Sequence, residues 1–100
     1  MATETSALCG DIDRFTVAAF REGLYRSIDA ADRAIVEIDL SGVTFMDSAG
    51  YWAVVEANAY AVGTDHLLVI RNLSVPCTKL VRICDQGNQL RLENDNPISH

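Results

Sequence analysis

The chain has 100 residues, 49% of them apolar, which is enough for one hydrophobic core and too little for two ordinary domains. The net charge is −6 and the eight Lys and Arg residues are scattered, which argues against nucleic acid or an anionic membrane as a partner. No apolar run is long enough to cross a bilayer and no signal segment is visible, so we expect a cytoplasmic protein. We expect a single domain over residues 1–100, with its core in 7–92 and loose tails at 1–6 and 93–100.

The cysteines and histidines give no metal or redox pattern. Cys9, Cys77 and Cys84 form an odd set without a C-x-x-C pair, so we interpret them as reduced thiols that are mostly buried. Neither His66 nor His100 has a second ligand at suitable spacing. The sequence therefore predicts no metal, no cofactor and no histidine general base.

A first helix is predicted over Val17–Ala30. Thr16 is a plausible N-cap, and Phe15 is placed to close a hydrophobic staple with Phe20. Apolar residues then recur at helical spacing: Phe20, Leu24 and Ile28. Boundaries read from such patterns are good to a few residues.

Four short stretches predict strands. Residues 7–9 favour a strand end, and the β-branched, alternating residues 34–40 favour a full strand, which 43–46 continues or ends near a turn at Ser41 and Gly42. The apolar run 67–70 is typical of a central strand covered on both faces, and 90–92 offers a last short strand.

Two more helices are predicted between these strands. The first runs from residue 49 or 50 to about Val62, because it is rich in alanine and valine, and Gly63 ends it. The second follows an N-cap at Ser74, tolerates Pro76 in its first turn and ends at Gly87. Its inner stripe consists of Cys77, Leu80, Val81 and Cys84. Strands alternating with helices indicate an α/β domain, with a mixed, mostly parallel sheet of about four strands packed with three to four helices.

The segment most informative about function is D-L-S-G-V-T-F-M-D-S-A-G, residues 39–50, which leads from a strand directly into a helix N-terminus. In an open α/β sheet, sites lie beyond the carboxyl ends of the strands, and the free N–H groups of a helix start attract anions. A hydroxyl held there is exposed and can carry a phosphate.

This run resembles the hallmark of the anti-sigma factor antagonists of the STAS domain family. The run G-D-I-D, residues 10–13, is similar to the family's G-E-L-D, and the order of the predicted elements agrees to about residue 92. The resemblance implies a small STAS-like α/β domain.

The resemblance also implies a partner-switching protein that is not an enzyme. In the family, the serine after the motif aspartate, which is Ser48 here, is phosphorylated by an anti-sigma factor that is itself a serine kinase. The unphosphorylated antagonist binds the kinase and frees the sigma factor, and a phosphatase resets the phosphorylated form. The expected partner-binding residues are Asp13, Asp47, Ser48, Gly50, Tyr51 and Trp52. Without the motif, Ser48 and Asp47 would be interpreted as ordinary helix caps.

Two features depart from the family pattern. Tyr51 and Trp52 replace a pair that is usually small or aliphatic, and Trp52, Glu56 and Tyr60 would share one helix face. Trp52 and Tyr60 are then either exposed anchors for a partner or, for Trp52, part of the domain's own core, and the pattern allows both. In addition, few residues precede the G-D-I-D run, which suggests an incomplete sheet edge and a monomer or weak dimer.

Two other functions compete with this one. An enzyme is disfavoured because the sequence has no nucleophile and base pair, no glycine-rich phosphate loop and no metal cluster. The other is a STAS interaction module without a switch, in a transport, lipid-trafficking or stress-signalling complex. Phosphate transfer to Ser48 would distinguish a switch from a module.

Overall fold

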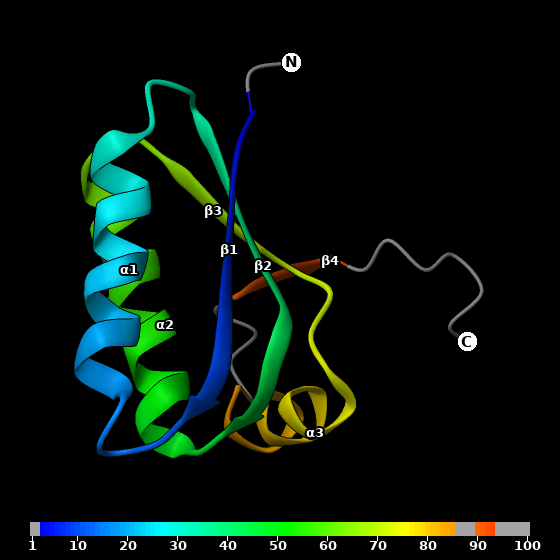
Figure 1. Cartoon of the computed structure of the whole chain (residues 1–100). Helices are drawn as coiled ribbons and strands as arrows, with labels where there is room; N and C mark the ends of the chain where they lie inside the picture. The colour runs from blue at the N-terminus through cyan, green and yellow to red at the C-terminus, as the bar shows by residue number, and fades with distance from the viewer. Residues whose placement is uncertain (1–2, 86–89, 94–100) are drawn as a thin grey trace.

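The computed structural model describes residues 3–85 and 90–93, and its elements alternate between strand and helix (Figure 1). In chain order they are β1 (Thr3–Ile12), α1 (Val17–Ala30), β2 (Ile35–Met46), α2 (Ser48–Gly63), β3 (Leu67–Arg71), α3 (Val75–Cys84) and β4 (Arg91–Glu93). The strands form one sheet in the order β1-β2-β3-β4, and all three pairings are parallel. This confirms the predicted α/β class.

Figure 1 shows α1 and α2 side by side on one face of the sheet, with α3 near the end at which β2 finishes. The core lies between this helix pair and the sheet. It is formed by the α1 stripe of Phe20, Leu24 and Ile28 and by alternate residues of β2, namely Val36, Ile38 and Leu40. These are the positions that the helical and strand periodicities select, because only one face of each element loses contact with water.

The prediction for the start of the chain is wrong. Instead of a short strand end at 7–9, β1 has ten residues and pairs with β2 from Thr3 opposite Ile35 to Ile12 opposite Met46. The pairing shifts register twice, and Gly10 has a φ of 98°, a backbone conformation that glycine adopts easily. The sheet edge is therefore formed. The polar residues 3–6 show no strand pattern in the sequence. They form a strand because their backbone pairs with the neighbouring β2.

The predicted turn at Ser41 and Gly42 is also absent, and β2 continues through both residues to Met46. Burial alternates strictly up to Leu40, then two exposed residues precede buried Val43. This break in alternation coincides with the register shifts of β1, so a bulged ladder replaces the turn.

At the start of α1, the predicted hydrophobic staple does not form. Phe20 is buried, but Phe15 is 79% exposed and lies under the guanidinium of Arg14, 4.8 Å from its ring centroid. Thr16 occupies the N-cap position, yet its hydroxyl donates to the carbonyl of Asp11 at 2.7 Å instead of capping the helix. The local turn holds this threonine and leaves Phe15 outside the core.

Helix α3 agrees with the prediction in its inner residues. Cys77 and Val81 are buried, Leu80 and Cys84 pack against the core, and Pro76 lies in the first turn. Ser74 occupies the N-cap position but its buried hydroxyl makes no cap hydrogen bond. The helix ends at Cys84, and the predicted stop at Gly87 lies outside the described residues. The loose tail predicted over 93–100 is wrong for Glu93, which pairs in β4, and its remaining residues lie outside the described part of the chain.

All three cysteines are free thiols, but only Cys77 is buried; Cys84 is half-buried and Cys9 is exposed. The expectation that most cysteines are buried is thus wrong for Cys9, which lies on β1, an edge strand of the sheet.

Candidate functional site

The carboxyl ends of β1 and β2 meet at one end of the sheet. Ile12 and Met46 form the last pair of this parallel ladder, and the N–H of Asp47 donates to the carbonyl of Ile12 at 3.0 Å. Asp13 and Asp47, which come directly after this pair, therefore lie at the same end of the molecule. The fold thus brings to one end of the sheet two residues that are 34 positions apart in the sequence.

Asp47 is the N-cap of α2. Its Oδ1 accepts hydrogen bonds from the N–H groups of Ala49 at 2.9 Å and Gly50 at 3.3 Å, two of the amides that a helix start leaves unpaired. Ser48 is the first helical residue, and its exposed side chain makes no hydrogen bond to any residue that the structure describes. The alternative in which Ser48 is the cap is therefore wrong.

Asp13 has an analogous local role before α1. Its Oδ1 accepts from the N–H of Phe15 at 2.8 Å and from the N–H of Thr16 at 3.1 Å. A carboxylate bonded to backbone amides two and three residues ahead fixes a tight turn. Asp13 and Asp47 are thus both held rigidly at the rim of the sheet.

Gly50 lies under the surface and determines how closely α2 approaches the sheet. A Cβ atom at this position would lie 2.5 Å from Cγ of Met46 and 2.9 Å from Cγ2 of Ile12. Only glycine fits there without displacing these side chains. Gly50 therefore places the Ser48 turn against the ends of β1 and β2.

The expectation that Tyr51 lies on a partner surface is wrong. Its side chain is fully buried, and its hydroxyl donates to Oδ1 of Asp85 at 2.6 Å. Burial of the phenol, reinforced by this hydrogen bond and by the charge of Asp85, raises the pKa of Tyr51 to about 12. Tyr51 is therefore a neutral hydrogen-bond donor inside the domain.

Trp52 is 53% exposed, so it is not part of the core. It lies one turn after Ser48, and its ring packs edge-on against Tyr51 with centroids 5.1 Å apart. Glu56 and Tyr60 share its exposed face, as predicted, but both are tied to α1. Glu56 pairs with Arg21 at 3.2 Å, and Tyr60 bonds to Asp29 and packs on Tyr25 with ring centroids 4.9 Å apart. Trp52 is therefore the aromatic residue of this face that is available near Ser48.

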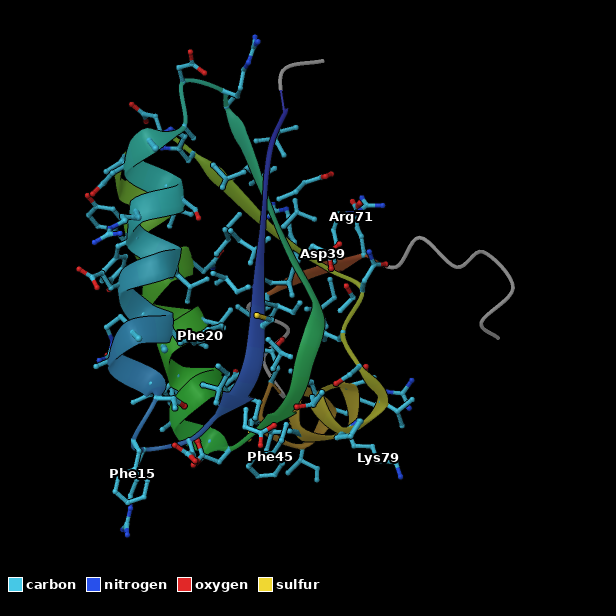
Figure 2. The ribbon with its side chains drawn as sticks, in the orientation of Figure 1. Phe15, Phe20, Asp39, Phe45, Arg71 and Lys79 are labelled. Atoms are coloured by element: carbon cyan, nitrogen blue, oxygen red, sulfur yellow. The ribbon has the colours of Figure 1, made fainter. Side chains whose placement is uncertain are left out.

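Two further exposed aromatic residues at this end were not identified from the sequence. Figure 2 shows Phe15 and Phe45 at the lower end of the molecule; Phe45 belongs to the last residues of β2 and is 49% exposed. Beside Phe45, the Thr44 hydroxyl bonds to the carboxylate of Asp11. In the sequence, Phe15 directly precedes the N-cap of a helix and Phe45 lies in a mostly apolar run. Both patterns are typical of core residues. Phe15 is exposed in the turn that Asp13 fixes, and Phe45 is exposed in the part of β2 where the burial alternation is broken.

Two kinds of feature are absent from the part of the chain that the structure describes: a cluster of metal-binding side chains and a helix able to cross a membrane. No group of three metal-binding side chains occurs there. None of the described helices is long and apolar enough to span a bilayer. What the site offers is an exposed hydroxyl at a helix start, two fixed carboxylates and three exposed aromatic rings.

Similarity to known proteins agrees with this architecture. An anti-sigma factor antagonist from Mycobacterium paratuberculosis has a TM-score of 0.75 at 18% identity, covering 92% of this chain and 77% of that one. A sulfate transporter family protein from Wolinella succinogenes has a TM-score of 0.72 at 17% identity, with 91% and 75% covered. The anti-sigma factor antagonist SpoIIAA in its unphosphorylated form has a TM-score of 0.69 at 19% identity, with 91% and 79% covered. At these identities the likeness shows the fold alone.

The family itself is identified by sequence. No curated protein matches this chain closely enough to be reported as a relative. The sequence profile of the family described as "Mlab, STAS domain" matches residues 3–92, which is nearly the whole chain. The chain therefore belongs to the STAS domain family.

Proposed function

We propose that this protein is an anti-sigma factor antagonist that binds an anti-sigma factor serine kinase and so releases a sigma factor. In this proposal Ser48 is the phosphorylation site, a phosphatase resets the protein, and the cycle runs in the cytoplasm of a bacterium. The protein itself acts as substrate and ligand and catalyses no step.

The observation that carries the proposal is the placement of Ser48. Its hydroxyl is exposed on the first residue of α2, while the capping role is already taken by Asp47. A kinase can therefore reach this hydroxyl without breaking a hydrogen bond that holds the helix. The surrounding run D-L-S-G-V-T-F-M-D-S-A-G resembles the hallmark run of the antagonists in the family.

Electrostatics explains how a phosphate would release the partner. Phosphorylation adds about two negative charges to Ser48, beside the carboxylate of Asp47 and on a protein whose net charge is already −6. The Ala49 and Gly50 amides that would otherwise stabilise a phosphate are bonded to Asp47. A partner that covers the site would have to bury a dianion next to a carboxylate, which is unfavourable without new cationic contacts. Water solvates the same group in the free protein.

The partner surface we propose surrounds Ser48. Trp52 supplies an exposed aromatic ring one helical turn away, and aromatic residues contribute strongly to protein interfaces. Asp13 and Asp47 supply two carboxylates whose positions are fixed by their backbone hydrogen bonds. Gly50 contributes by setting the position of the turn, since it is buried.

A second candidate function is a STAS interaction module that does not switch. The observation in its favour is the similarity of this fold to a sulfate transporter family protein, at a TM-score of 0.72. In that case Ser48 would stay unmodified and the same surface would bind its partner permanently. The two candidates differ in one property, whether Ser48 accepts a phosphoryl group.

Intact-mass spectrometry after incubation with ATP and each candidate anti-sigma kinase of the same genome tests the proposal. We expect one added phosphate on the parent protein, none on Ser48→Ala, and one on the matched control Ser41→Ala, whose exposed serine lies within β2. A stable complex with a kinase but no phosphate would favour the interaction module. Phosphate on Ser48→Ala would place the modification at another residue.

A further inference from the structure

Among residues 8–85 and 90–93, whose side chains the structure describes, Asp85 is the one charged side chain that is buried, with 7% of its surface exposed. It caps the C-terminal end of α3, where its N–H donates to the carbonyl of Val81 at 2.7 Å. Removing a carboxylate from water is costly unless hydrogen-bond donors replace the water. The position of Asp85 therefore depends on the donors that surround it.

Two of these donors come from different parts of the fold. The Tyr51 hydroxyl donates to Oδ1 at 2.6 Å, and the N–H of Leu90 donates to Oδ2 at 3.3 Å. Tyr51 belongs to the first turn of α2, and Leu90 immediately precedes β4. One carboxylate thus joins the start of α2, the end of α3 and the start of β4.

The Ser48 turn is fixed to this carboxylate through Tyr51. Tyr51 follows Ser48 by three residues, and its ring is fully buried and packs against Trp52. On the opposite side, Gly50 presses the same turn against Met46 and Ile12. Because the phenol cannot swing into solvent, a displacement of the turn must either move Asp85 or break the hydrogen bond.

We infer that Tyr51 is a positioning residue: its hydrogen bond to Asp85 sets the place of the Ser48 turn relative to the end of α3. This rests on the proposed function for the role of Ser48. We expect a negative charge at Ser48 to be repelled by the Asp47 carboxylate beside it, and this repulsion to displace the first turn of α2. The displacement passes through the Tyr51 hydroxyl to Asp85, the residue that caps the end of α3, and to Leu90, which precedes β4.

Amide chemical shifts in ¹H–¹⁵N NMR spectra test this inference without any partner. Ser48→Glu is introduced into the parent and into Tyr51→Phe, and the shift changes caused by the new charge are compared. In the parent we expect changes at Ala49, Gly50, Asp85 and Leu90. In Tyr51→Phe we expect the changes at Asp85 and Leu90 to fall to less than half while those at Ala49 and Gly50 persist. Equal changes in both backgrounds, or none at Asp85 in the parent, would overturn the inference.

Asp85→Asn separates positioning from a merely structural role. The amide keeps an oxygen that accepts from Tyr51, so the shift changes at residue 85 and at Leu90 should persist although stability falls. If Tyr51 and Asp85 only stabilise the fold, the shift changes at residue 85 and at Leu90 should decrease in Asp85→Asn as much as in Tyr51→Phe. If Tyr51→Phe does not fold, Asp85→Ala removes the same hydrogen bond, and a retained response at Leu90 in that variant would overturn the inference. Because no kinase is used, an unphosphorylated Ser48 would refute the proposed function and leave this result standing.

Discussion

Gly50 and Met46 determine how closely α2 lies against the sheet, because a Cβ on Gly50 would stand 2.5 Å from Cγ of Met46. The contact joins the last residue of β2 to the first turn of α2, with only Asp47 between the two elements. The depth of the Ser48 turn is therefore fixed by packing below it.

Gly50→Ala should destabilise the domain by about 1–3 kcal/mol, because the added methyl forces Met46 and Ile12 out of place. Chemical denaturation of the two proteins measures this difference. Gly63→Ala is the matched control, since a Cβ there meets nothing within 4 Å, and its change should stay within about 1 kcal/mol of the parent. Equal effects of both substitutions would show that the close contact does not limit the position of α2.

Asp47→Ala should lower the free energy of unfolding by about 1 kcal/mol, because the amides of Ala49 and Gly50 lose their acceptor. Asp47→Asn keeps a side-chain oxygen at the N-cap and should retain most of the stability. Urea denaturation at neutral pH compares the three proteins. A loss in the asparagine variant as large as in the alanine variant would mean that the cap geometry contributes little.

Trp52→Ala should weaken binding to the cognate kinase by tenfold or more and leave stability within about 0.5 kcal/mol of the parent, since the side chain is 53% exposed. Calorimetric titration and thermal denaturation measure the two quantities. Val62→Ala removes a side chain of similar exposure at the far end of α2 and should not change affinity. Unchanged affinity in Trp52→Ala would place the interface elsewhere.

Asp39 makes stability depend on acid pH. The N–H of Ser41 donates to its carboxylate at 2.8 Å and is the main reason that the pKa of Asp39 lies below its ordinary value of 3.8; the Ser41 side chain, Asn72 and Arg71 add to the effect. A carboxyl whose folded pKa is depressed contributes stability above 3.8, and this contribution is lost as pH falls through the lower folded value. We therefore expect the unfolding free energy of Asp39→Asn to depend less on pH below about 4 than that of the parent. Parallel pH profiles of the two proteins would contradict this.

The elements with strong periodicity could be predicted from the sequence alone. Helix α1 was predicted with the observed bounds because Phe20, Leu24 and Ile28 recur every four residues, and β3 because its apolar run is short and uninterrupted. The motif from Asp39 to Gly50 indicated the strand-to-helix junction and a resemblance to the family that the match over residues 3–92 then showed. The helix, the strand and the motif could be predicted because each depends on residues that are close together in the sequence.

The details that the sequence left open were decided by contacts between distant elements. The polar residues 3–6 join the sheet because their backbone pairs with β2. Phe15 is exposed because the Asp13 carboxylate fixes the turn that contains it. Tyr51 and Trp52 are adjacent and equally aromatic, yet one is buried and the other exposed. The two side chains lie on different faces of α2. Only the fold of the chain brings Asp85, 34 residues later in the sequence, against the face that carries Tyr51.

The sequence by itself determined the fold class and the family and pointed to the serine that we propose as the switch, because periodicity and a contiguous motif are properties of the order of residues along the chain. The tertiary structure decided which residues around that serine are accessible and which are held in place. Accessibility depends on the neighbours that packing brings close, and at this site those neighbours come from β1, β2 and α3, all outside the helix that carries Ser48.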